Sequence, residues 1–414
     1  MVYDTIVVGA GASGLVAAIA AAREGASVCL IERNDRVGRK ILSTGNGRCN
    51  LANRRLELGH FHGSNVGFAG TVLHVVGLGR VLEFFSGLGL DIAEEEGRLY
   101  PLSMQAAAVL DVLRHEVDRL GIRTVTDTRV ERIARSGGGY AIITGQQRLE
   151  ARRVILATGG KAAPKLGTTG DGYALASSFG HRIIDPVPAL VGLRLSSPHL
   201  KGLAGVRIKG AVSIPELGIK HHGEVLFAEY GISGIPVFDL SAGASSRFRS
   251  GASLHLVVSI IQETPAVVLE RMKQRFSALA HKSALDALIG MLPRQIGPAL
   301  LKDAGFSSLH KAAGAVSQAE LASLATLLCA WKFPVVGHNG WDQAQTTAGG
   351  VDPSQVSPED MQSKLCQGLY FAGEIVDVHG DCGGYNLMWA WSSGMLAGAR
   401  SAGRTDRQSF NVNH

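Results

Sequence analysis

The apolar positions at the start of the chain fall into short runs separated by an Ala-rich stretch. Val2 to Val8 form a compact run rich in β-branched residues, which predicts a buried strand. The Ala-rich stretch predicts a helix to about Glu24, closed by Gly25, and Ser27 to Ile31 predict a second strand. The order strand, helix, strand indicates an α/β domain.

Predicted helices and strands continue to follow one another up to about residue 186. Residues 71–90 predict a helix with one apolar face, and residues 94–101 predict a turn-rich return. Gln105 to Leu120 predict a clear helix. Arg123 to Val130 and Tyr140 to Thr144 predict two strands joined by a Gly turn, and Val154 to Ala157 predict a further buried strand.

The pattern of apolar and polar positions changes after Pro186-Val-Pro188. Residues 190–260 show short alternating runs with turn residues between them, which predicts a β-rich piece. From Thr264-Pro265, an N-cap and first-turn pair, to about Trp331 the pattern is helical. Near the end of the chain, Leu369 to Ala372 predict a short buried strand, and an apolar helix begins near Asn386.

The first chemical motif follows the first strand directly. Gly9-Ala-Gly11-Ala-Ser-Gly14 stands between strand and helix, and the second strand ends on Glu32. This is the dinucleotide-binding fingerprint in its required context, with glycines for the turn, for close approach of a pyrophosphate and for helix packing. Glu32 is expected to accept hydrogen bonds from a ribose, so its loss should affect the nucleotide more than the fold. The alternative is a Gly-rich turn without a ligand.

Two further segments provide Gly-rich backbone for a dinucleotide. The basic stretch from Arg36 to Asn53 is too irregular for a periodic element, and its Lys40 and Arg48 can wrap a pyrophosphate and a flavin edge. The alternative is a solvated surface loop. The buried strand that ends at Ala157-Thr-Gly-Gly is the other place where backbone can lie against the ligand.

The C-terminal stretch Gly368 to Gly398 indicates which dinucleotide is bound. Its strand breaks at Gly373-Glu374, passes through a Gly-rich loop and enters the helix near Asn386. The positive end of that helix suits the N1/C2=O region of a flavin, whose anionic reduced form it would stabilise. A long cofactor such as FAD needs contacts from distant segments, whereas a nicotinamide dehydrogenase has no evident use for this one.

Composition and charge narrow the kinds of partner, metal site and compartment expected for the protein. The chain has 414 residues, 46% of them hydrophobic, and a formal charge of +6 without a run of five basic residues, which favours an ordinary basic surface over a nucleic-acid site. Its five cysteines form no C-x-x-C pair, so no metal site is expected and a reducing cytoplasm fits. No cleavable signal and no apolar run of about 18 residues is seen. The oligomeric state stays open.

Several blocks of the sequence resemble the BaiN/RdsA-type NAD(P)/FAD-dependent oxidoreductases, relatives of the two-dinucleotide-binding-domain flavoproteins. The blocks run from end to end of the chain. They are Ile6-Val-Val-Gly-Ala-Gly-Ala-Ser-Gly-Leu, Gly38-Arg-Lys-Ile-Leu-Ser-Thr-Gly-Asn-Gly-Arg-Cys-Asn-Leu, Ala157-Thr-Gly-Gly, Thr169-Gly-Asp-Gly-Tyr, Tyr230-Gly-Ile-Ser-Gly, Ala344-Gln-Thr-Thr-Ala-Gly-Gly-Val and Gly383-Gly-Tyr-Asn-Leu.

The resemblance implies a discontinuous Rossmann-like FAD-binding domain, residues 1–190 and 340–414. An inserted domain would occupy residues 191–339, with a β-rich part (191–260) and a helical part (261–339). FAD would be bound non-covalently. The residues expected to line it are Gly9, Gly11, Ala12, Ser13, Gly14, Glu32, Arg33, Lys40, Asn46, Arg48, Cys49, Asn50, Val130, Ala157, Thr158, Gly159, Gly373, Glu374, Gly384, Asn386 and Leu387.

The expected activity is a flavin-dependent reduction. NAD(P)H would give hydride to flavin N5, and the flavin would pass it to a small conjugated, enone-like substrate. No second complete G-x-G-x-x-G is present, so NAD(P)H would dock transiently or a protein would be the donor. Candidates for the proton donor and oxyanion partner are Tyr385, Tyr230, His379 and Asp381.

Three alternatives accompany this hypothesis. In the first, the protein is a nucleic-acid-modifying flavoprotein, although the insert shows no Arg/Lys-rich helix. In the second, it is a non-catalytic FAD-binding redox sensor. Cys49 would act as a redox-active thiol in a further variant, but no second cysteine follows at a suitable spacing. Neither a nucleic acid nor a membrane is an expected partner.

Overall fold

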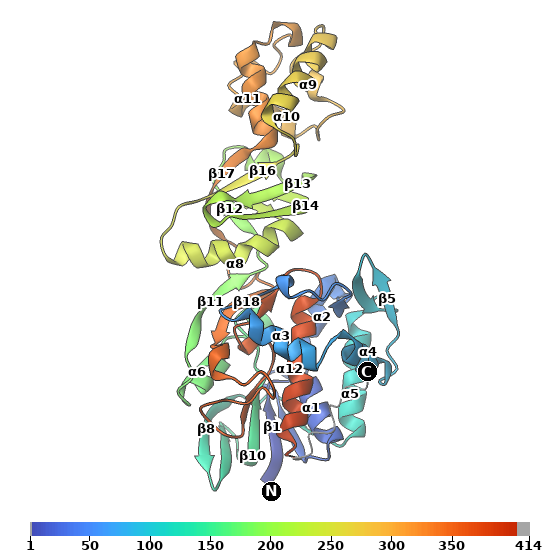
Figure 1. Cartoon of the computed structure of the whole chain (residues 1–414), viewed down its shortest axis with the longest axis vertical. Helices are drawn as coiled ribbons and strands as arrows, with labels where there is room; N and C mark the ends of the chain where they lie inside the picture. Colours follow the sequence, from blue (N-terminus) through green and yellow to red (C-terminus); the bar gives the residue numbers. More distant parts are fainter. Residues whose placement is uncertain (1, 404–414) are drawn as a thin grey trace. The chain divides into compact units, whose positions relative to one another are not determined.

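The central sheet of the molecule is built around β1 (Val2–Val8) and β10 (Arg148–Leu156), in a computed structural model that describes residues 2–403. Within these residues, the chain divides into two units, 2–187 with 346–403, and 188–345. The first unit therefore contains both ends of the described chain (Figure 1). Its sheet runs in the order β7-β2-β1-β10-β9-β8, and β19 also pairs with β10.

The pairing within this sheet explains why both ends of the chain reach one site. β1 pairs in parallel with β2 and with the length of β10, and β19 pairs in parallel with the last residues of β10. The first half of β10 pairs with β9 in antiparallel fashion. The remaining strands of the sheet are β2 (Val28–Ile31), β7 (Arg123–Val125), β8 (Val130–Ser136), β9 (Gly139–Thr144) and β19 (Leu369–Phe371).

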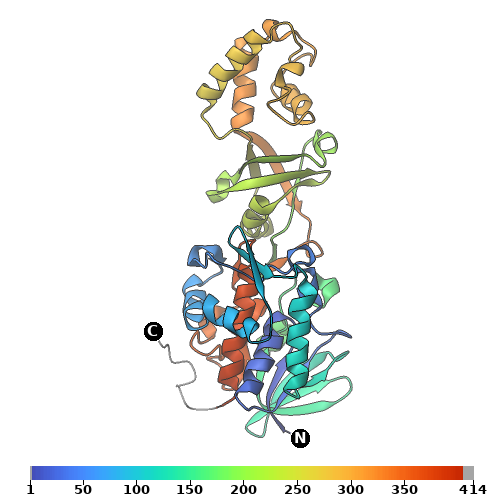
Figure 2. The same ribbon diagram turned by 90° about the vertical axis from the view of Figure 1, so that its right-hand side faces the viewer.

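Helices α1 (Ala12–Arg23) and α12 (Tyr385–Ser401) lie side by side in this unit (Figures 1 and 2). Two glycines of α12 permit this contact, because a Cβ at Gly394 would stand 2.4 Å from the carbonyl oxygen of Ser13. At Gly398 it would stand 2.2 Å from the carbonyl oxygen of Ala17. The other helices of the unit are α2 (Arg39–Ser43), α3 (Val66–Val75), α4 (Leu78–Ser86), α5 (Ala106–Arg119) and α6 (Asp171–Ser177).

Small sheets complete the first unit. β4 pairs with β20, β3 and β5 flank β6, and β11 pairs with β18 where the chain leaves and re-enters the unit. Their bounds are β3 (Ala52–Asn53), β4 (Phe61–His62), β5 (Ile92–Glu95), β6 (Arg98–Pro101), β11 (Ile183–Ala189), β18 (Thr346–Val351) and β20 (His379–Gly380).

The second unit contains a closed barrel with the strand order β12-β15-β14-β13-β16-β17. Helices α9, α10 and α11 contribute to the same apolar core as the barrel. The elements are β12 (Leu193–Leu195), α7 (Leu200–Leu203), β13 (Arg207–Ile214), β14 (Ile219–Ala228), β15 (Gly231–Ser233), α8 (Ile235–Arg249), β16 (Leu254–Ser259), α9 (Pro265–Ala278), α10 (Ile296–Asp303), α11 (Gln318–Cys329) and β17 (Trp331–His338).

The structure confirms the α/β character of the first unit and corrects several sequence predictions. The β-rich stretch 191–260 also contains the long helix α8, and the stretch 261–339 predicted to be helical ends in strand β17. The predicted helix over 71–90 is two helices, α3 and α4, that begin earlier and meet at an angle of 47°. The predicted strand over 123–130 is interrupted between β7 and β8.

Among the described residues, no single helix has both the length and the apolar character required to cross a membrane. The bent pair α3–α4 meets the criterion only when its two helices are taken together.

Candidate functional site

The β1–α1 turn lies against the end of β10. Gly9 has φ of +100°, and a Cβ there would stand 2.5 Å from the carbonyl oxygen of Ala157. A Cβ at Gly14 would stand 1.8 Å from the carbonyl oxygen of Gly9. Both glycines are therefore required by close packing of backbone on backbone.

Gly11 differs from its two neighbours in the motif because its side faces open space. A Cβ at Gly11 would meet no atom within 4 Å. Gly11 is also the N-cap of α1, which has no side-chain cap and no acidic residue in its first turn. Space next to uncapped backbone N–H groups at the positive end of a helix suits an anionic group such as a pyrophosphate.

Glu32 lies beneath this turn and is only 7% exposed. Its Oε2 accepts a hydrogen bond from the backbone N–H of Ala10 at 2.9 Å. Its Oε1 accepts from the backbone N–H and the side-chain amide of Asn34, at 2.9 and 2.7 Å. Glu32 thus holds the turn in shape, in addition to any contact it makes with a ligand.

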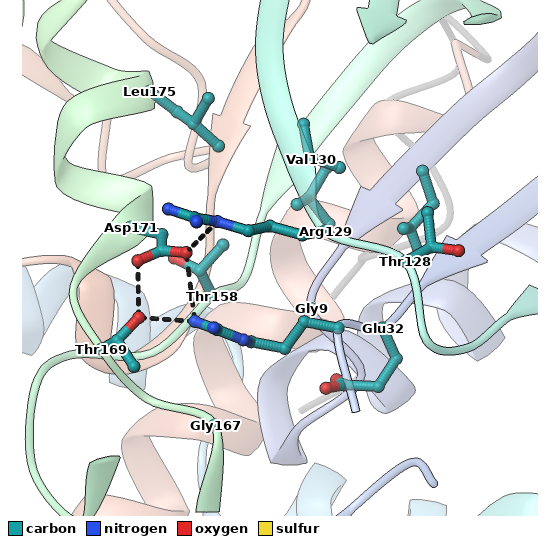
Figure 3. A pocket seen from close by; sticks show the side chains of 13 residues that line it. Gly9, Glu32, Thr128, Arg129, Val130, Thr158, Gly167, Thr169, Asp171 and Leu175 are labelled. Atoms are coloured by element: carbon teal, nitrogen blue, oxygen red, sulfur yellow. Dashed lines mark hydrogen bonds and ion pairs between the residues drawn. The ribbon is translucent and has the colours of Figure 1, made fainter. Parts of the chain in front are cut away.

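A pocket lies at the end of β1 and β2 (Figure 3). Thirteen residues line it, and five of them are predicted cofactor residues: Gly9, Glu32, Arg33, Val130 and Thr158. The hydroxyl of Thr158 is buried and has no hydrogen-bond partner within the described residues. The structure therefore brings together residues from three separate parts of the sequence.

An ion-pair network lies along one side of this pocket. The carboxylate of Asp171 pairs with Arg33 at 3.1 Å and with Arg129 at 2.8 Å, and it accepts a hydrogen bond from the Thr169 hydroxyl at 2.5 Å (Figure 3). Arg129, Thr169 and Asp171 are absent from the predicted set of cofactor residues. Thr169 and Asp171 belong to the block Thr169-Gly-Asp-Gly-Tyr, which was available as a signal.

The segment from residue 36 to 50 contains more regular structure than its sequence predicts. It forms the short helix α2 and then a turn in which Gly45, Asn46, Gly47 and Cys49 all have positive φ. Such a turn directs successive backbone N–H groups toward one side, an arrangement that binds anions. The segment therefore has a defined backbone structure and is not merely a solvated loop.

The polar residues of this segment have different partners. The Nζ of Lys40 contacts the Glu374 carboxylate at 2.8 Å, which joins the segment to the C-terminal motif. Arg48 is directed elsewhere: its guanidinium pairs with Glu95 at 3.1 Å and lies over the ring of Tyr100. Asn50 carries a buried side-chain oxygen without a hydrogen-bond partner in the described part of the chain.

Cys49 is fully buried, and burial raises the pKa of its thiol to about 11, although the nearby Thr44 side chain acts to lower that pKa. A thiol in this state is protonated at neutral pH and is a poor nucleophile. The geometry therefore disfavours the redox-active thiol considered from the sequence.

The turn at Gly373-Glu374 follows β19, next to the end of β10. The backbone N–H of Ala372 donates to the carbonyl oxygen of Leu156 at 3.0 Å, and a Cβ at Gly373 would stand 2.5 Å from the Ser13 hydroxyl. Glu374 also accepts from the hydroxyl and backbone N–H of Thr347. The first and last motifs of the chain therefore meet where β1, β10 and β19 end, and Ala157 at the end of β10 lies against Gly9.

The loop before α12 is held by Asn386. Its amide donates to the carbonyl oxygen of Gly380 at 2.8 Å, and its oxygen accepts from the Gly380 N–H at 2.9 Å. The N-cap of α12 is Gly384, which has no side-chain cap, and a Cβ there would stand 2.8 Å from the unpartnered oxygen of Asn50. A second uncapped helix end thus lies beside the turn at 44–50. Leu387, the next predicted residue, packs partly against the core.

Three of the four predicted catalytic candidates lie together, with two histidines that the sequence analysis did not identify. Asp381 contacts Nδ1 of His60 at 2.9 Å and Nε2 of His62 at 2.6 Å. His379 stands opposite His62 in the β4–β20 pair. The ring of Tyr385 stacks on His60 at 4.4 Å between centroids. The sequence His60-Phe-His62 shows two histidines close together, but only the pairing of β4 with β20 brings them to Asp381.

The remaining candidate and the two tryptophans of α12 have other surroundings. Tyr230 belongs to the second unit and lies in the turn between β14 and β15. Trp389 and Trp391 are buried, and their Nε1–H groups donate to the carbonyl oxygens of Gly373 and Leu51. They pack in the core and support the loops on either side of α12.

Burial and hydrogen bonding together set the ionisation of Asp381 and His379. It raises the pKa of Asp381, but the hydrogen bonds from His62 and His60 outweigh this effect and leave the pKa below its ordinary value. Burial, together with the nearby His62, lowers the pKa of His379 to about 4. The Nδ1 of His379 has no hydrogen-bond partner within the described residues. Asp381 is thus a carboxylate at neutral pH, and His379 is neutral.

The chain is similar along nearly its whole length to proteins of known activity. It is 40% identical over 407 residues to the 3-dehydro-bile acid delta(4,6)-reductase of Clostridium scindens, which covers 96% of this chain and 98% of that protein. It is 28% identical over 402 residues to the ribosomal RNA dihydrouridine synthase of Escherichia coli, with 94% and 96% of the two chains covered. The enzyme of that name from Haemophilus influenzae is 29% identical over 398 residues, again with 94% and 96% covered.

A solved structure shares the fold at low sequence identity. The Escherichia coli quinol fumarate reductase FrdA matches with a TM-score of 0.51 and 16% identity, over 97% of this chain and 70% of that one. The model of the HI0933-like protein Rossmann domain matches residues 3–400. The chain therefore belongs to the HI0933-like family of Rossmann-domain proteins, the BaiN/RdsA-type group that its sequence blocks resemble.

Proposed function

We propose that the protein is an FAD-dependent oxidoreductase that reduces a conjugated carbon–carbon double bond in a small enone-like substrate. NAD(P)H would be the electron donor. The observation that carries this proposal is the meeting of the Gly9–Gly14 turn and the Gly373-Glu374 turn at adjacent strand ends on either side of β10. An elongated dinucleotide needs both segments, because its two ends lie far apart.

The residues at this edge fit FAD in several ways. Gly11 leaves open space at an uncapped helix end, and Gly384 provides a second uncapped end beside the 44–50 turn. Buried oxygens of Asn50 and Thr158 have no hydrogen-bond partner within the described residues. Unsatisfied buried polar atoms cost free energy, so their presence at predicted ligand positions supports a cofactor that would satisfy them.

Each group of residues would hold one part of the cofactor. Glu32, Arg33 and Val130 would hold the adenosine end, the N-terminus of α1 the pyrophosphate, and Glu374 with Lys40 the ribityl chain. The N-terminus of α12 would face the N1/C2=O side of the flavin and favour its negative charge in the reduced form. When bound, the flavin supplies hydride transfer through N5.

The substrate class is supported by the bile-acid reductase of Clostridium scindens, whose name describes reduction of a 3-oxo steroid at its 4 and 6 positions. Its 40% identity over nearly the full length makes a related dienone the best first substrate to test. NAD(P)H is proposed as a transiently bound donor because the sequence has no second complete G-x-G-x-x-G.

The test begins with the purified protein reconstituted with FAD. We expect stoichiometric yellow protein, flavin bleaching by NADH or NADPH without oxygen, and recovery of colour when a 3-oxo-4,6-diene bile acid is added. A protein that takes up no FAD would refute the proposal at its first step. A flavin that bleaches but is not reoxidised by the dienone would refute the substrate class alone.

A second candidate function is the reduction of uridine in ribosomal RNA. Two relatives with nearly full-length coverage are ribosomal RNA dihydrouridine synthases, and their existence leaves the expectation of no nucleic-acid substrate unconfirmed. Residues 188–345 carry 15 Lys and Arg against 10 Asp and Glu, so five of the six net positive charges belong to the second unit. Such an excess favours a polyanionic partner. Reoxidation of the reduced flavin by 23S or 16S ribosomal RNA, and not by the dienone, would establish this function instead.

A further inference from the structure

His60, His62 and Asp381 form a group of titratable side chains that neither Gly motif explains. The short pair β4–β20 sets their positions, because it places His62 opposite His379 and Phe61 opposite Gly380. Asp381 follows β20 directly, and its own N–H donates to the carbonyl oxygen of His60 at 3.0 Å. Asp381 is therefore tied to His60 through both its backbone and its side chain.

The side chain of Asp381 is less exposed than the side chains of His60 and His62. The Asp381 side chain is 13% exposed, whereas the side chains of His60 and His62 are 35% and 42% exposed. The carboxylate is thus covered by the rings, and the rings reach the surface.

The orientation of His60 is fixed from two sides. Its Nδ1 faces Asp381, and its ring stacks on Tyr385 with an angle of 20° between the planes. The Tyr385 hydroxyl donates to the carbonyl oxygen of Arg55 at 3.1 Å, which holds that ring in turn. Since a carboxylate only accepts hydrogen bonds, Nδ1 of His60 carries hydrogen, and its Nε2 is directed away from Asp381.

The cluster is adjacent to the proposed flavin end of the site. Asp381 and Tyr385 flank the loop that leads into α12, whose uncapped end at Gly384 would face the flavin. Asn386 clamps that loop through Gly380, the residue before Asp381. The unpartnered Nδ1 of His379, a residue only 8% exposed, indicates a polar group that the protein itself does not supply.

We propose that His60, held by Asp381 and accompanied by His62, delivers the proton in the reduction, an assignment that rests on the proposed function. In the reaction, hydride from the reduced flavin would add to one carbon of the conjugated double bond. His60 in its imidazolium form would give a proton from Nε2 to the other carbon and become neutral. Water would then restore the proton to His60. Asp381 remains a carboxylate throughout and acts as a positioning residue.

The surroundings of His60 define the expected pH dependence. The titratable groups near it are Asp381, His62, His379 and Tyr385, and burial keeps His379 neutral at neutral pH. Because His60 must be protonated to act, the rate of reduction should fall as pH rises and His60 loses its proton.

The experiment separates the reaction of the reduced flavin from its formation. FAD-loaded wild type, His60→Gln and Asp381→Asn would be reduced with dithionite and mixed with the 3-oxo-4,6-diene bile acid in a stopped-flow instrument. The matched control is His255→Gln, because His255 is 41% exposed and also contacts a carboxylate, that of Glu216, at 2.9 Å. We expect His60→Gln to slow flavin reoxidation about 100-fold and to flatten its pH profile, as loss of a general acid does.

The other variants should behave differently. Asp381→Asn should slow reoxidation about tenfold, because a neutral amide holds the Nδ1 hydrogen of His60 less firmly than a carboxylate does. His255→Gln should match the wild type. In His60→Ala, added imidazole should restore part of the rate in proportion to its concentration, which a purely structural role would not allow.

Two results would overturn the assignment. Reoxidation of His60→Gln within threefold of wild type, or with an unchanged pH profile, would remove His60 from proton delivery. So would equal losses in FAD content and rate that imidazole does not restore, since these indicate a displaced cofactor. If the dienone fails to reoxidise the wild-type flavin, the proposed substrate class fails and this assignment fails with it. A reactive wild type with an equally reactive variant refutes only the assignment.

Discussion

Ser13, in the first turn of α1, donates its hydroxyl to the carbonyl oxygen of Ala372, the last residue before the Gly373 turn, at 3.2 Å. These residues are 359 positions apart in the sequence. The bond joins the two Gly turns that are proposed to hold one cofactor, and both residues are buried. The site therefore depends on how tightly α1 and α12 approach each other below it.

The first prediction concerns that approach. Gly394→Ala places a Cβ 2.4 Å from the carbonyl oxygen of Ser13 and must push α12 away from α1. We expect a loss of about 1–3 kcal/mol in the free energy of unfolding, because backbone cannot yield as a flexible side chain does. Flavin content should fall in parallel. Gly79→Ala in α4 is the control, since its Cβ meets nothing within 4 Å and should raise stability by about 0.5–1 kcal/mol. Urea unfolding with equal m-values would measure both.

The second prediction separates folding from binding within the Gly motif. Gly11→Val should fold normally, because Gly11 has an extended backbone and open space around its side, but should weaken FAD binding at least about tenfold by filling the phosphate position. Gly14→Ala should instead cost about 3 kcal/mol or more, since its Cβ would stand 1.8 Å from the Gly9 oxygen. Fluorescence titration with FAD and thermal melting give the two readouts. Unchanged affinity in Gly11→Val would place the phosphates elsewhere.

The elements that the sequence predicted correctly are those with strong local patterns. The β-branched run of β1 and the fingerprint around Gly9 need no knowledge of distant contacts. Helix α8 was missed because short alternating runs flank it and small residues dominate its length, so that packing through Val237, Leu240 and Ala244 decides its structure. Strand β17 was missed because Pro334 interrupts a run that otherwise alternates between buried and exposed positions.

The residues of the site likewise divide into those that the sequence predicted and those that only the structure identifies. Of the five predicted residues around the pocket, Gly9, Glu32 and Thr158 come from sequence motifs, whereas Arg33 and Val130 were expected from the family resemblance alone. Arg48 carries a guanidinium that could bind a phosphate, yet its partners Glu95 and Tyr100 lie on β5 and β6, which no local pattern connects to it. His60 and His62 became candidates only through the pairing of β4 with β20, two short strands whose contact no sequence period predicts.

The third prediction tests the chemical state of Cys49. Because burial raises the pKa of this thiol to about 11, it should react with iodoacetamide only after unfolding. Cys49→Ala should keep the rates of flavin reduction and reoxidation within about threefold of wild type, although its small cavity should cost about 1 kcal/mol of stability. Mass spectrometry of labelled native protein provides the measurement. Rapid native labelling of Cys49 together with lost turnover would restore the thiol as a redox group.

The fourth prediction concerns stability at low pH. Hydrogen bonds from Arg119, followed by Arg23, outweigh burial and lower the pKa of Glu116 to about 2. A depressed pKa in the folded state means that the stabilisation is present above pH 4.5 and is lost as pH falls from there toward 2. Glu116→Gln should therefore be less stable than wild type by about 1–3 kcal/mol at pH 7, and the two should converge near pH 2. Urea unfolding at a series of pH values measures the difference, and a gap that persists at low pH would assign it to packing.

The last prediction concerns Glu32, whose structural surroundings change the expectation drawn from the sequence. A residue that only contacted a ribose would affect FAD and leave the fold intact. Glu32, however, accepts hydrogen bonds from Ala10 and twice from Asn34 while nearly buried. Glu32→Gln offers one acceptor oxygen in place of two, so one buried N–H loses its partner.

We therefore expect Glu32→Gln to lower the free energy of unfolding by about 1–3 kcal/mol and to weaken FAD binding about tenfold or more. The two effects have one origin, because the N–H of Ala10 belongs to the turn that would hold the cofactor. Glu150→Gln on β10 is the control, since its side chain is 44% exposed and forms a surface ion pair with Arg148. Calorimetric melting without FAD and fluorescence titration with it separate the two quantities. A variant that binds FAD as tightly as wild type while losing stability would show that Glu32 shapes the turn without contacting the nucleotide.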